Sequence, residues 1–422
     1  MTVASLFNAL VCSRFRMFAA AVLALAATGC DNSPYARGAT AENTLYSAFA
    51  ARSPRYMDPT ASYSNNETPY TFSIYEPLYG YHYLKRPYTL VVKTAVEVVQ
   101  PRYVGKAGQP LSADAPGDAI AESIYEIRIK PGILYAPHPA FAKDASGAHA
   151  YHALSRAQVG DKRSPWQFAQ TGTRELVAED YVYALKRQAT TRIQAPVFAT
   201  FAEHVLGLEE YGALIKAEDK KLLAGRDPAD PDKPFLDFRR WPLAGVQAVD
   251  SHTLRIRLKG KYPQWSFWLA MPFTAPVPWE ADAFYAQPGM SRNGLSLNTW
   301  PVGTGPYMMT EYVQDRRHVM QRNPNYRADP YPCEGMPGDK EAGLLDDCGK
   351  NMPFIDKLVF NNEKEGVSLA SKFRQGYLDV PEIERPEHGV TFGIEAEDSE
   401  ARAREYKDKG FKLPKTVDIS SW

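Results

Sequence analysis

Three histidines lie close together in the sequence and have the side-chain type that could hold a metal ion. They are His138, His149 and His152, and the last two could share one face of a helix and bind a metal. Their surroundings, DASGAHAYHALS, are small and polar, which is typical of a surface loop. The sequence therefore favours a loop here, and we expect neither a metal site nor a cofactor.

Acidic pairs are the second feature that could do chemistry, as general acids or bases. Glu209-Glu210 and Asp346-Asp347 both lie in charged runs, where a solvated face explains them better than catalysis. The sequence also contains no G-x-S-x-G elbow, no H-E-x-x-H helix and no Walker A loop. We expect no catalytic residues and no ATP hydrolysis by this chain, and the alternative is an exported hydrolase acting on peptides or cell wall.

The charge balance argues against nucleic acid as a partner. Lys plus Arg and Asp plus Glu each number 49, which leaves a net charge of zero. Neutralising phosphates needs a basic excess, so we expect no nucleic-acid partner. A chain of 422 residues with 44% hydrophobic residues is long enough for two or three domains with proper cores.

Two cysteines, Cys333 and Cys348, flank a loop rich in glycine and acidic residues. In an exported protein this arrangement favours a disulfide, which could contribute about 3 kcal/mol by closing the loop. The alternative is a metal site, but two thiols supply too few ligands for structural zinc.

The N-terminus has the pattern of an export signal. Arg14 and Arg16 precede or flank an apolar run, residues 17–27, that is too short to span a bilayer as a helix. The residues Ala27-Thr28-Gly29-Cys30 resemble the bacterial lipobox, which implies acylation of Cys30. We expect a signal peptide over residues 1–30 and a flexible tether over residues 31–44. An ordinary signal peptide that ends near a cysteine is the alternative.

The body of the chain alternates between strand and helix patterns. We expect strands at residues 45–50, 124–130, 246–249 and 253–258, and helices at residues 71–78 and 175–192. In the second helix, Val177 stands where a capping residue is usual and cannot cap through its side chain. Residues 204–240 read as an inserted helical loop at the surface, and Trp265, Phe267, Trp268 and Phe273 read as core.

The segment Pro301–Arg327 carries the most specific pattern. It predicts a Gly-Thr-Gly-Pro turn, a strand, a polar turn, a second strand and an Asn-Pro-Asn-Tyr exit. Gly303 and Gly305 are expected to allow backbone angles that other residues resist. Together with Met57-Asp58-Pro59 and Glu76-Pro77-Leu78-Tyr79, in this order, the segment resembles the family 5 extracellular solute-binding proteins of bacteria.

This resemblance implies an α/β fold of the two-lobed periplasmic-binding-protein type, class II-like with mixed sheets. It implies that the protein captures peptides or related small solutes and delivers them to the permease and ATPase subunits of an ABC importer. It also implies a location in the periplasm or cell envelope, with the lipid anchor at Cys30. A peptide-sensing receptor with the same fold is a further alternative.

The resemblance also divides the chain and suggests a ligand-binding wall. We expect a first lobe over residues 45–307 and the beginning of a second lobe over residues 308–422, with a helix at residues 367–376. Because the chain ends where a strand has just begun, the second lobe is expected to be incomplete and the chain truncated. Tyr63, Ser64 and Asn65 are predicted to contact the ligand, with Thr304 near the hinge.

Overall fold

The computed structural model describes residues 34–35, 43–49 and 52–380. The predicted signal peptide, Cys30 and the residues from 381 onward lie outside this part of the chain. Contacts divide the protein into a larger unit, Glu42–Lys364, and a smaller one made of Met1–Ala41 and Glu365–Trp422. Among the described residues, no helix has the length and apolar character that a membrane span requires.

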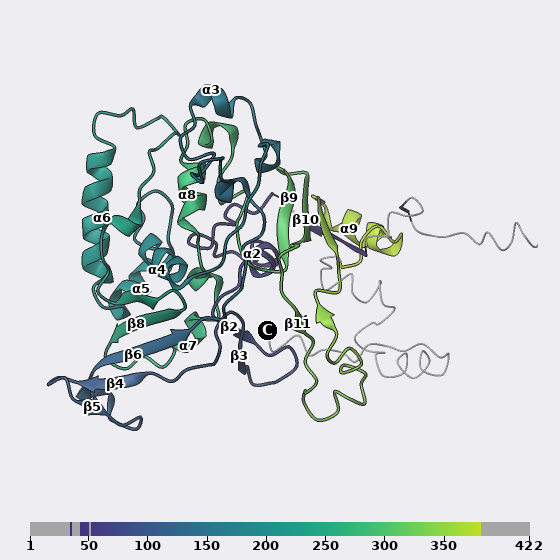
Figure 1. Cartoon of the computed structure of the whole chain (residues 1–422). Coiled ribbons are helices and arrows are strands. Elements are labelled where there is room, and N and C mark those ends of the chain that lie inside the picture. The colour runs from purple at the N-terminus through teal and green to yellow at the C-terminus, as the bar shows by residue number, and fades with distance from the viewer. Residues whose placement is uncertain (1–33, 36–42, 50–51, 381–422) are drawn as a thin grey trace, which may run out of the picture. The chain divides into compact units, whose positions relative to one another are not determined.

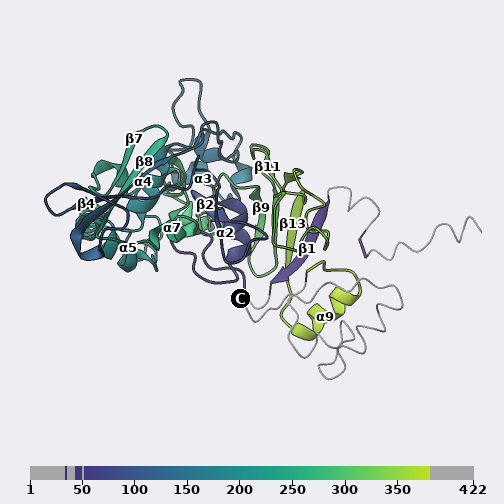
Figure 2. The ribbon, with the colours of Figure 1, turned by 90° about the horizontal axis from the view of Figure 1, so that it is seen from below.

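The larger unit contains a four-stranded sheet in which the start of the described chain meets its later part. Its order is β1-β13-β10-β9, with β1 parallel to β13 and the other pairs antiparallel (Figure 2). The strands are β1 (Thr44–Phe49), β9 (Tyr307–Val313), β10 (Arg317–Arg322) and β13 (Lys357–Asn362). Our predicted lobe boundary at residues 307 and 308 falls inside this unit, just at the start of β9, and stays a prediction.

A second sheet is fully antiparallel and follows the predicted alternation of apolar and polar residues. In β8, the side chains of Leu254, Ile256 and Leu258 are buried while those between them are half-buried. The order is β5-β4-β6-β8-β7 (Figure 1). The strands are β4 (Arg102–Gly105), β5 (Pro110–Leu111), β6 (Ile120–Arg128), β7 (Val246–Asp250) and β8 (Thr253–Lys259).

Helices cover this second sheet. Helices α4 (Ala178–Arg187) and α5 (Phe198–His204) both pack on it. Helix α6 (Leu208–Leu222) lies beside α5, and its Leu208, Tyr211 and Ile215 form one buried face. The segment predicted as an inserted helical loop at the surface is indeed helical over α6. This helix is partly a core element, because its apolar residues recur at helical spacing.

Helix α4 begins without a side-chain cap at Val177, as the sequence predicted, and the Asp180 side chain binds back to the Val177 backbone from inside the first turn. The Val177 backbone N–H donates to Asp180 Oδ2 over 3.0 Å. Asp180 is buried and pairs with Arg174, which also binds Glu280. The negative charge at the helix start is thus held in place by an arginine and interacts favourably with the helix dipole.

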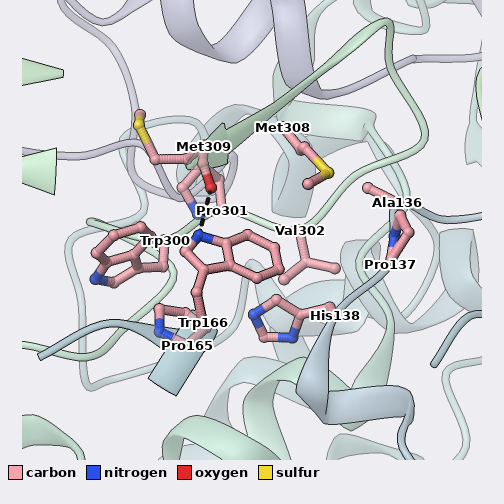
Figure 3. Close-up of a pocket in the computed structure, with 10 residues that line it drawn as sticks. All are labelled: Ala136, Pro137, His138, Pro165, Trp166, Trp300, Pro301, Val302, Met308 and Met309. Carbon is pink, nitrogen blue, oxygen red and sulfur yellow. Dashed lines mark hydrogen bonds between the residues drawn. The ribbon is translucent and has the colours of Figure 1, made fainter. Parts of the chain in front are cut away.

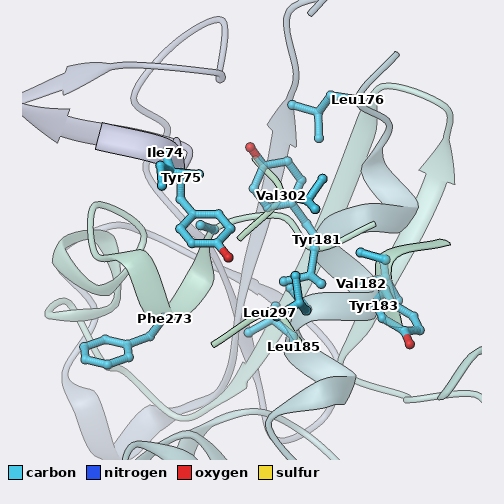
Figure 4. Close-up of a cluster of buried hydrophobic side chains, with 14 of the residues drawn as sticks. Ile74, Tyr75, Leu176, Tyr181, Val182, Tyr183, Leu185, Phe273, Leu297 and Val302 are labelled. Carbon is cyan, nitrogen blue, oxygen red and sulfur yellow. The ribbon is translucent and has the colours of Figure 1, made fainter. Parts of the chain in front are cut away.

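Helix α2 (Thr68–Ile74) differs from the predicted range of residues 71–78. It begins three residues earlier and ends at Tyr75, which is extended. The end follows from the sequence, because Pro77 disfavours a helical conformation at Glu76. Ile74 and Tyr75 pack in the main hydrophobic core beside Val302 and Tyr181 (Figure 4).

The remaining elements of the larger unit are short. They are β2 (Tyr79–Tyr81), β3 (Leu90–Val92), α3 (Arg156–Val159), α7 (Trp265–Trp268), α8 (Trp279–Tyr285), β11 (Asp329–Pro330) and β12 (Asn351–Met352). Of the aromatic residues predicted as core around α7, Trp265 is fully buried, whereas Phe267 is 46% exposed and was assigned wrongly. The two residues are two positions apart and fall on different faces of the helix.

The smaller unit contains α9 (Gly366–Arg374), close to the helix predicted at residues 367–376. Within this unit, the Tyr35 hydroxyl donates to the Tyr377 carbonyl over 2.7 Å. The two rings meet edge to face with centroids 6.1 Å apart.

Candidate functional site

The loop that leads into α2 contains the predicted ligand contacts and is held by a buried carboxylate at each end. Asp58 at its start is 2% exposed, and Glu67 at its end is 1% exposed. Between them, residues 63–66 are exposed to solvent. We call residues 58–67 the wall loop. The structure brings Tyr63, Ser64 and Asn65 together on its exposed part.

Glu67 binds the backbone of its own loop. Its Oε1 accepts the N–H of Tyr56 over 2.9 Å. Its Oε2 accepts the N–H of Tyr63 over 2.8 Å and that of Ser64 over 3.0 Å. One carboxylate therefore ties the residue before the wall loop to the exposed residues within it.

Asp58 is held by a cation from a distant part of the chain. Its two carboxylate oxygens accept from Nη1 and Nη2 of Arg187, at 2.6 and 2.7 Å, across 129 sequence positions. Asp58 Oδ1 also accepts the N–H of Thr60 over 3.0 Å. Such a bidentate pair fixes orientation as well as distance. It joins the wall loop to the last turn of α4.

Arg187 has a second anionic partner, because its Nε donates to Asp282 of α8 over 2.7 Å. Asp282 also accepts from the Tyr183 hydroxyl over 2.9 Å. Burial lowers the pKa of Arg187, but the Asp282 and Asp58 carboxylates raise it more, so the net shift is well upward. The guanidinium therefore stays charged inside the protein.

The exposed part of the wall loop has free backbone groups and an aromatic side chain. Within the described residues, the N–H groups of Asn65 and Asn66 donate to no protein acceptor. Tyr63 is 70% exposed, and its ring lies 5.8 Å from that of Phe273. Free N–H groups beside an exposed ring are suited to bind an extended peptide backbone.

Thr304 lies at the other end of α2, away from Tyr63. Its side chain is 1% exposed, and its Oγ1 has no hydrogen-bond partner within the described residues. In this conformation the Thr304 side chain is closed off from solvent, and its contact with a ligand stays a prediction. The structure thus brings three of the four predicted ligand contacts together and leaves Thr304 in the core.

The glycines on either side of Thr304 are needed for close contact rather than for unusual backbone angles. A Cβ on Gly303 would lie 2.0 Å from the Ile74 carbonyl oxygen, and one on Gly305 would lie 2.6 Å from it. The Gly305 N–H donates to that oxygen over 2.8 Å. Neither glycine has a positive φ, so our reason for them was wrong. They allow the turn to bind the last carbonyl of α2.

Ion pairs and amides join the sequence motifs to one another. Arg327, which follows the Asn-Pro-Asn-Tyr exit, binds Glu76 through two hydrogen bonds of 2.7 and 2.8 Å. Asn323 donates from its side chain to the Gly305 carbonyl over 2.9 Å. These contacts explain why Glu-Pro-Leu-Tyr, Gly-Thr-Gly-Pro and Asn-Pro-Asn-Tyr occur together.

A cavity next to the Gly303 turn is too small for a peptide. It has a volume of about 10 Å³ and lies between His138, Trp166, Trp300 and Met309, with Trp166 Nε1 donating to the Met309 carbonyl (Figure 3). A volume of that size holds about one water molecule. Burial lowers the pKa of His138 to about 3, so this histidine is neutral at physiological pH.

The other predicted features lie outside the wall loop. Cys333 and Cys348 form a disulfide with Cα atoms 4.5 Å apart. His149 and His152 stack with ring centroids 4.1 Å apart and are half-buried against Trp279. The described residues contain no group of three potential ligands that could hold a metal ion.

Sequence reasoning missed Glu67 and Arg187 as parts of the site. Arg187 had been placed only in the helix, because nothing local links it to Asp58 across 129 positions. A signal for Glu67 did exist, since a lone carboxylate just before a helix can accept the free backbone N–H groups of the approaching chain.

The comparisons with known proteins agree on one family. Residues 170–402, more than half of the chain, match the model of "Bacterial extracellular solute-binding proteins, family 5 Middle". The periplasmic oligopeptide-binding protein OppA of Escherichia coli is 26% identical over 153 residues, which are 36% of this chain and 23% of that protein. Di/tripeptide-binding protein 2 of Pseudomonas aeruginosa is 34% identical over 82 residues, 19% of this chain and 15% of the other.

Among solved structures, the murein tripeptide binding protein MppA of Escherichia coli matches with a TM-score of 0.48 and 16% identity. That match covers 83% of this chain and 48% of MppA, so the chain spans about half the length of this relative. Because the family model covers more than half of the sequence, the chain belongs to the family 5 bacterial extracellular solute-binding proteins, with their α/β fold.

Proposed function

We propose that this protein captures peptides, or related small solutes, outside the inner membrane and delivers them to an ABC permease. Family membership supports a solute-binding role, and relatives named for oligopeptide and di/tripeptide binding support peptides as the solute. The ATPase subunit would be a separate partner, because the sequence has no Walker A loop.

The observation that carries the proposal within this chain is the wall loop. It presents an exposed ring at Tyr63 and the N–H groups of Asn65 and Asn66, which have no acceptor in the part of the chain that the structure describes. A peptide can pair its carbonyls with such donors whatever its side chains are. Binding through the backbone suits a protein that accepts peptides of varied sequence.

The location follows from the proposed role. Capture outside the inner membrane requires export and favours retention near the permease, which an acylated Cys30 would provide. A disulfide between Cys333 and Cys348 suits an oxidising compartment such as the periplasm. Labelling cells with radioactive palmitate, with Cys30→Ala as control, tests the anchor; equal labelling of both forms would contradict it.

Peptide capture is tested by native mass spectrometry of the purified chain mixed with equimolar tri- and pentapeptides. We expect one peptide to be retained per chain and recovered intact after denaturation. Retention of no peptide would contradict binding, and recovery of cleaved peptide would favour the hydrolase alternative.

A further inference from the structure

We propose that Glu67 is the residue that positions the wall loop for the ligand, an inference that rests on the proposed function. Glu67 itself is buried and does not face the solute. It acts through Tyr63 and Ser64, whose N–H groups it binds at 2.8 and 3.0 Å. It is therefore a positioning residue.

The hydrogen bonds of Glu67 cross the loop instead of following it. Its Oε1 holds the Tyr56 N–H over 2.9 Å, on the chain that enters the wall loop. Its own N–H donates to the Ser64 carbonyl over 2.9 Å, and its carbonyl accepts from Tyr70 and Thr71 at the start of α2. Glu67 thus connects the entering chain, the exposed residues and the helix.

Glu67 differs from the other buried carboxylates near it in having no cation. Asp58 pairs with Arg187 and Glu76 pairs with Arg327. Glu67 forms no ion pair within the described residues, so backbone N–H groups alone compensate for its burial. A buried carboxylate needs its hydrogen-bond donors, so it favours the one loop conformation in which all three of these backbone N–H groups reach it.

This arrangement prepares the loop before a ligand arrives. With Tyr63 and Ser64 turned toward Glu67, the next two N–H groups, of Asn65 and Asn66, are left without protein acceptors within the described residues. A solute then meets two donors in an already ordered turn and does not have to order them. Apparent affinity depends directly on the fraction of molecules in the binding-competent conformation.

The test substitutes Glu67→Gln in the full chain and uses trialanine, a peptide with minimal side chains, as the probe. An amide has one acceptor oxygen where a carboxylate has two, so at least one of the three N–H groups loses its partner. We expect about tenfold weaker binding of trialanine, corresponding to a competent fraction of about one tenth. Glu67→Asp, which keeps both acceptors but moves them back, should recover part of what Glu67→Ala loses.

Two further readouts separate positioning from general stability. Hydrogen exchange resolved to single amides should accelerate at Tyr63 and Ser64 in Glu67→Ala, which removes both acceptor oxygens, by about the factor that trialanine binding loses in this variant. The matched control is Glu209→Gln, an exposed glutamate of α6 whose side chain has no hydrogen-bond partner within the described residues, and which should change neither binding nor exchange.

The outcomes distinguish this proposal from the proposed function. Unchanged exchange at Tyr63 and Ser64 in Glu67→Ala would overturn the role of Glu67, whatever the binding result. The role of Glu67 would also be overturned if exchange became faster but the affinity for trialanine stayed within twofold of that of the Glu209→Gln control. If the unsubstituted chain binds no peptide, the proposed function fails, while the exchange data still decide whether Glu67 holds the loop.

Discussion

Replacing Arg187 with methionine should lower the free energy of unfolding more than almost any other single change to a charged residue. Arg187 donates two hydrogen bonds to Asp58, one to Asp282 and one to Thr60, all between 2.6 and 2.7 Å. Methionine keeps most of the volume but removes the positive charge. Two carboxylates then remain without their cation.

The magnitude follows from the burial of those carboxylates. The Asp58 side chain is 3% exposed, so its charge loses a partner where water cannot replace it. The Asp282 side chain is 17% exposed and keeps the Tyr183 hydroxyl, so its share is smaller. Removing one partner of a buried ion pair costs about 3–5 kcal/mol. We therefore expect Arg187→Met to lower the free energy of unfolding by about 4 kcal/mol.

The assay is urea unfolding followed by tryptophan fluorescence, with the slope checked for constancy. The matched control is Arg128→Met, since Arg128 pairs with Glu97 at 3.0 Å but both side chains are more than half exposed. An exposed pair contributes about 0–1 kcal/mol. The double variant Arg187→Met with Asp58→Asn should regain part of the loss, because the buried charge is removed too. A loss for Arg187→Met no larger than that of the control would refute this reasoning.

Three other predictions concern stability. Burial lowers the pKa of His318 to about 4, below the value of about 6.5 in the unfolded chain. Stability should therefore fall as pH drops from 6.5 to 4. His318→Phe should flatten that part of a plot of unfolding free energy against pH, and an unchanged slope would contradict this effect of His318. Removing the disulfide with Cys333→Ala and Cys348→Ala should cost about 3 kcal/mol in urea unfolding, and a reductant should lower the midpoint of the unsubstituted chain alone. Gly303→Ala should destabilise the protein strongly, because the new Cβ would lie 2.0 Å from a carbonyl oxygen. The Cβ of Gly117→Ala would meet nothing within 4 Å among the described residues, so this variant should be nearly neutral in thermal unfolding. Equal effects of the two variants would argue against the close contact.

Elements with a clear periodic pattern could be predicted from the sequence. The alternation in β8 and the helical pattern over residues 175–192 predicted these two elements within about five residues of their bounds. Both patterns depend on neighbours in the chain, which a sequence contains directly. The end of α2 was placed four residues too late, because the helical pattern continues past the point where Pro77 begins to act.

The parts of the site that depend on distant contacts could not be predicted. Asp58 was part of a recognised motif and Arg187 fell within a predicted helix, but their pairing follows from how α4 packs against the wall loop. The sequence indicated that the turn needs Gly303 and Gly305. The reason, their contact with the Ile74 carbonyl, depends on a residue far away in the chain and is visible only in the structure. The exposed position of Tyr63 was consistent with its polar surroundings, whereas the burial of Thr304 was not visible from its neighbours.

The most direct test of the account is hydrogen exchange of residues 63–66 in the full chain, with and without a saturating tripeptide. If the wall loop binds the peptide backbone, the amides of Asn65 and Asn66 should exchange more slowly with the peptide present, because without it no acceptor among the described residues binds them. The Tyr63 and Ser64 amides, already bound to Glu67, should change much less. Peptide binding that leaves Asn65 and Asn66 unprotected would contradict the assignment of this loop as the ligand wall.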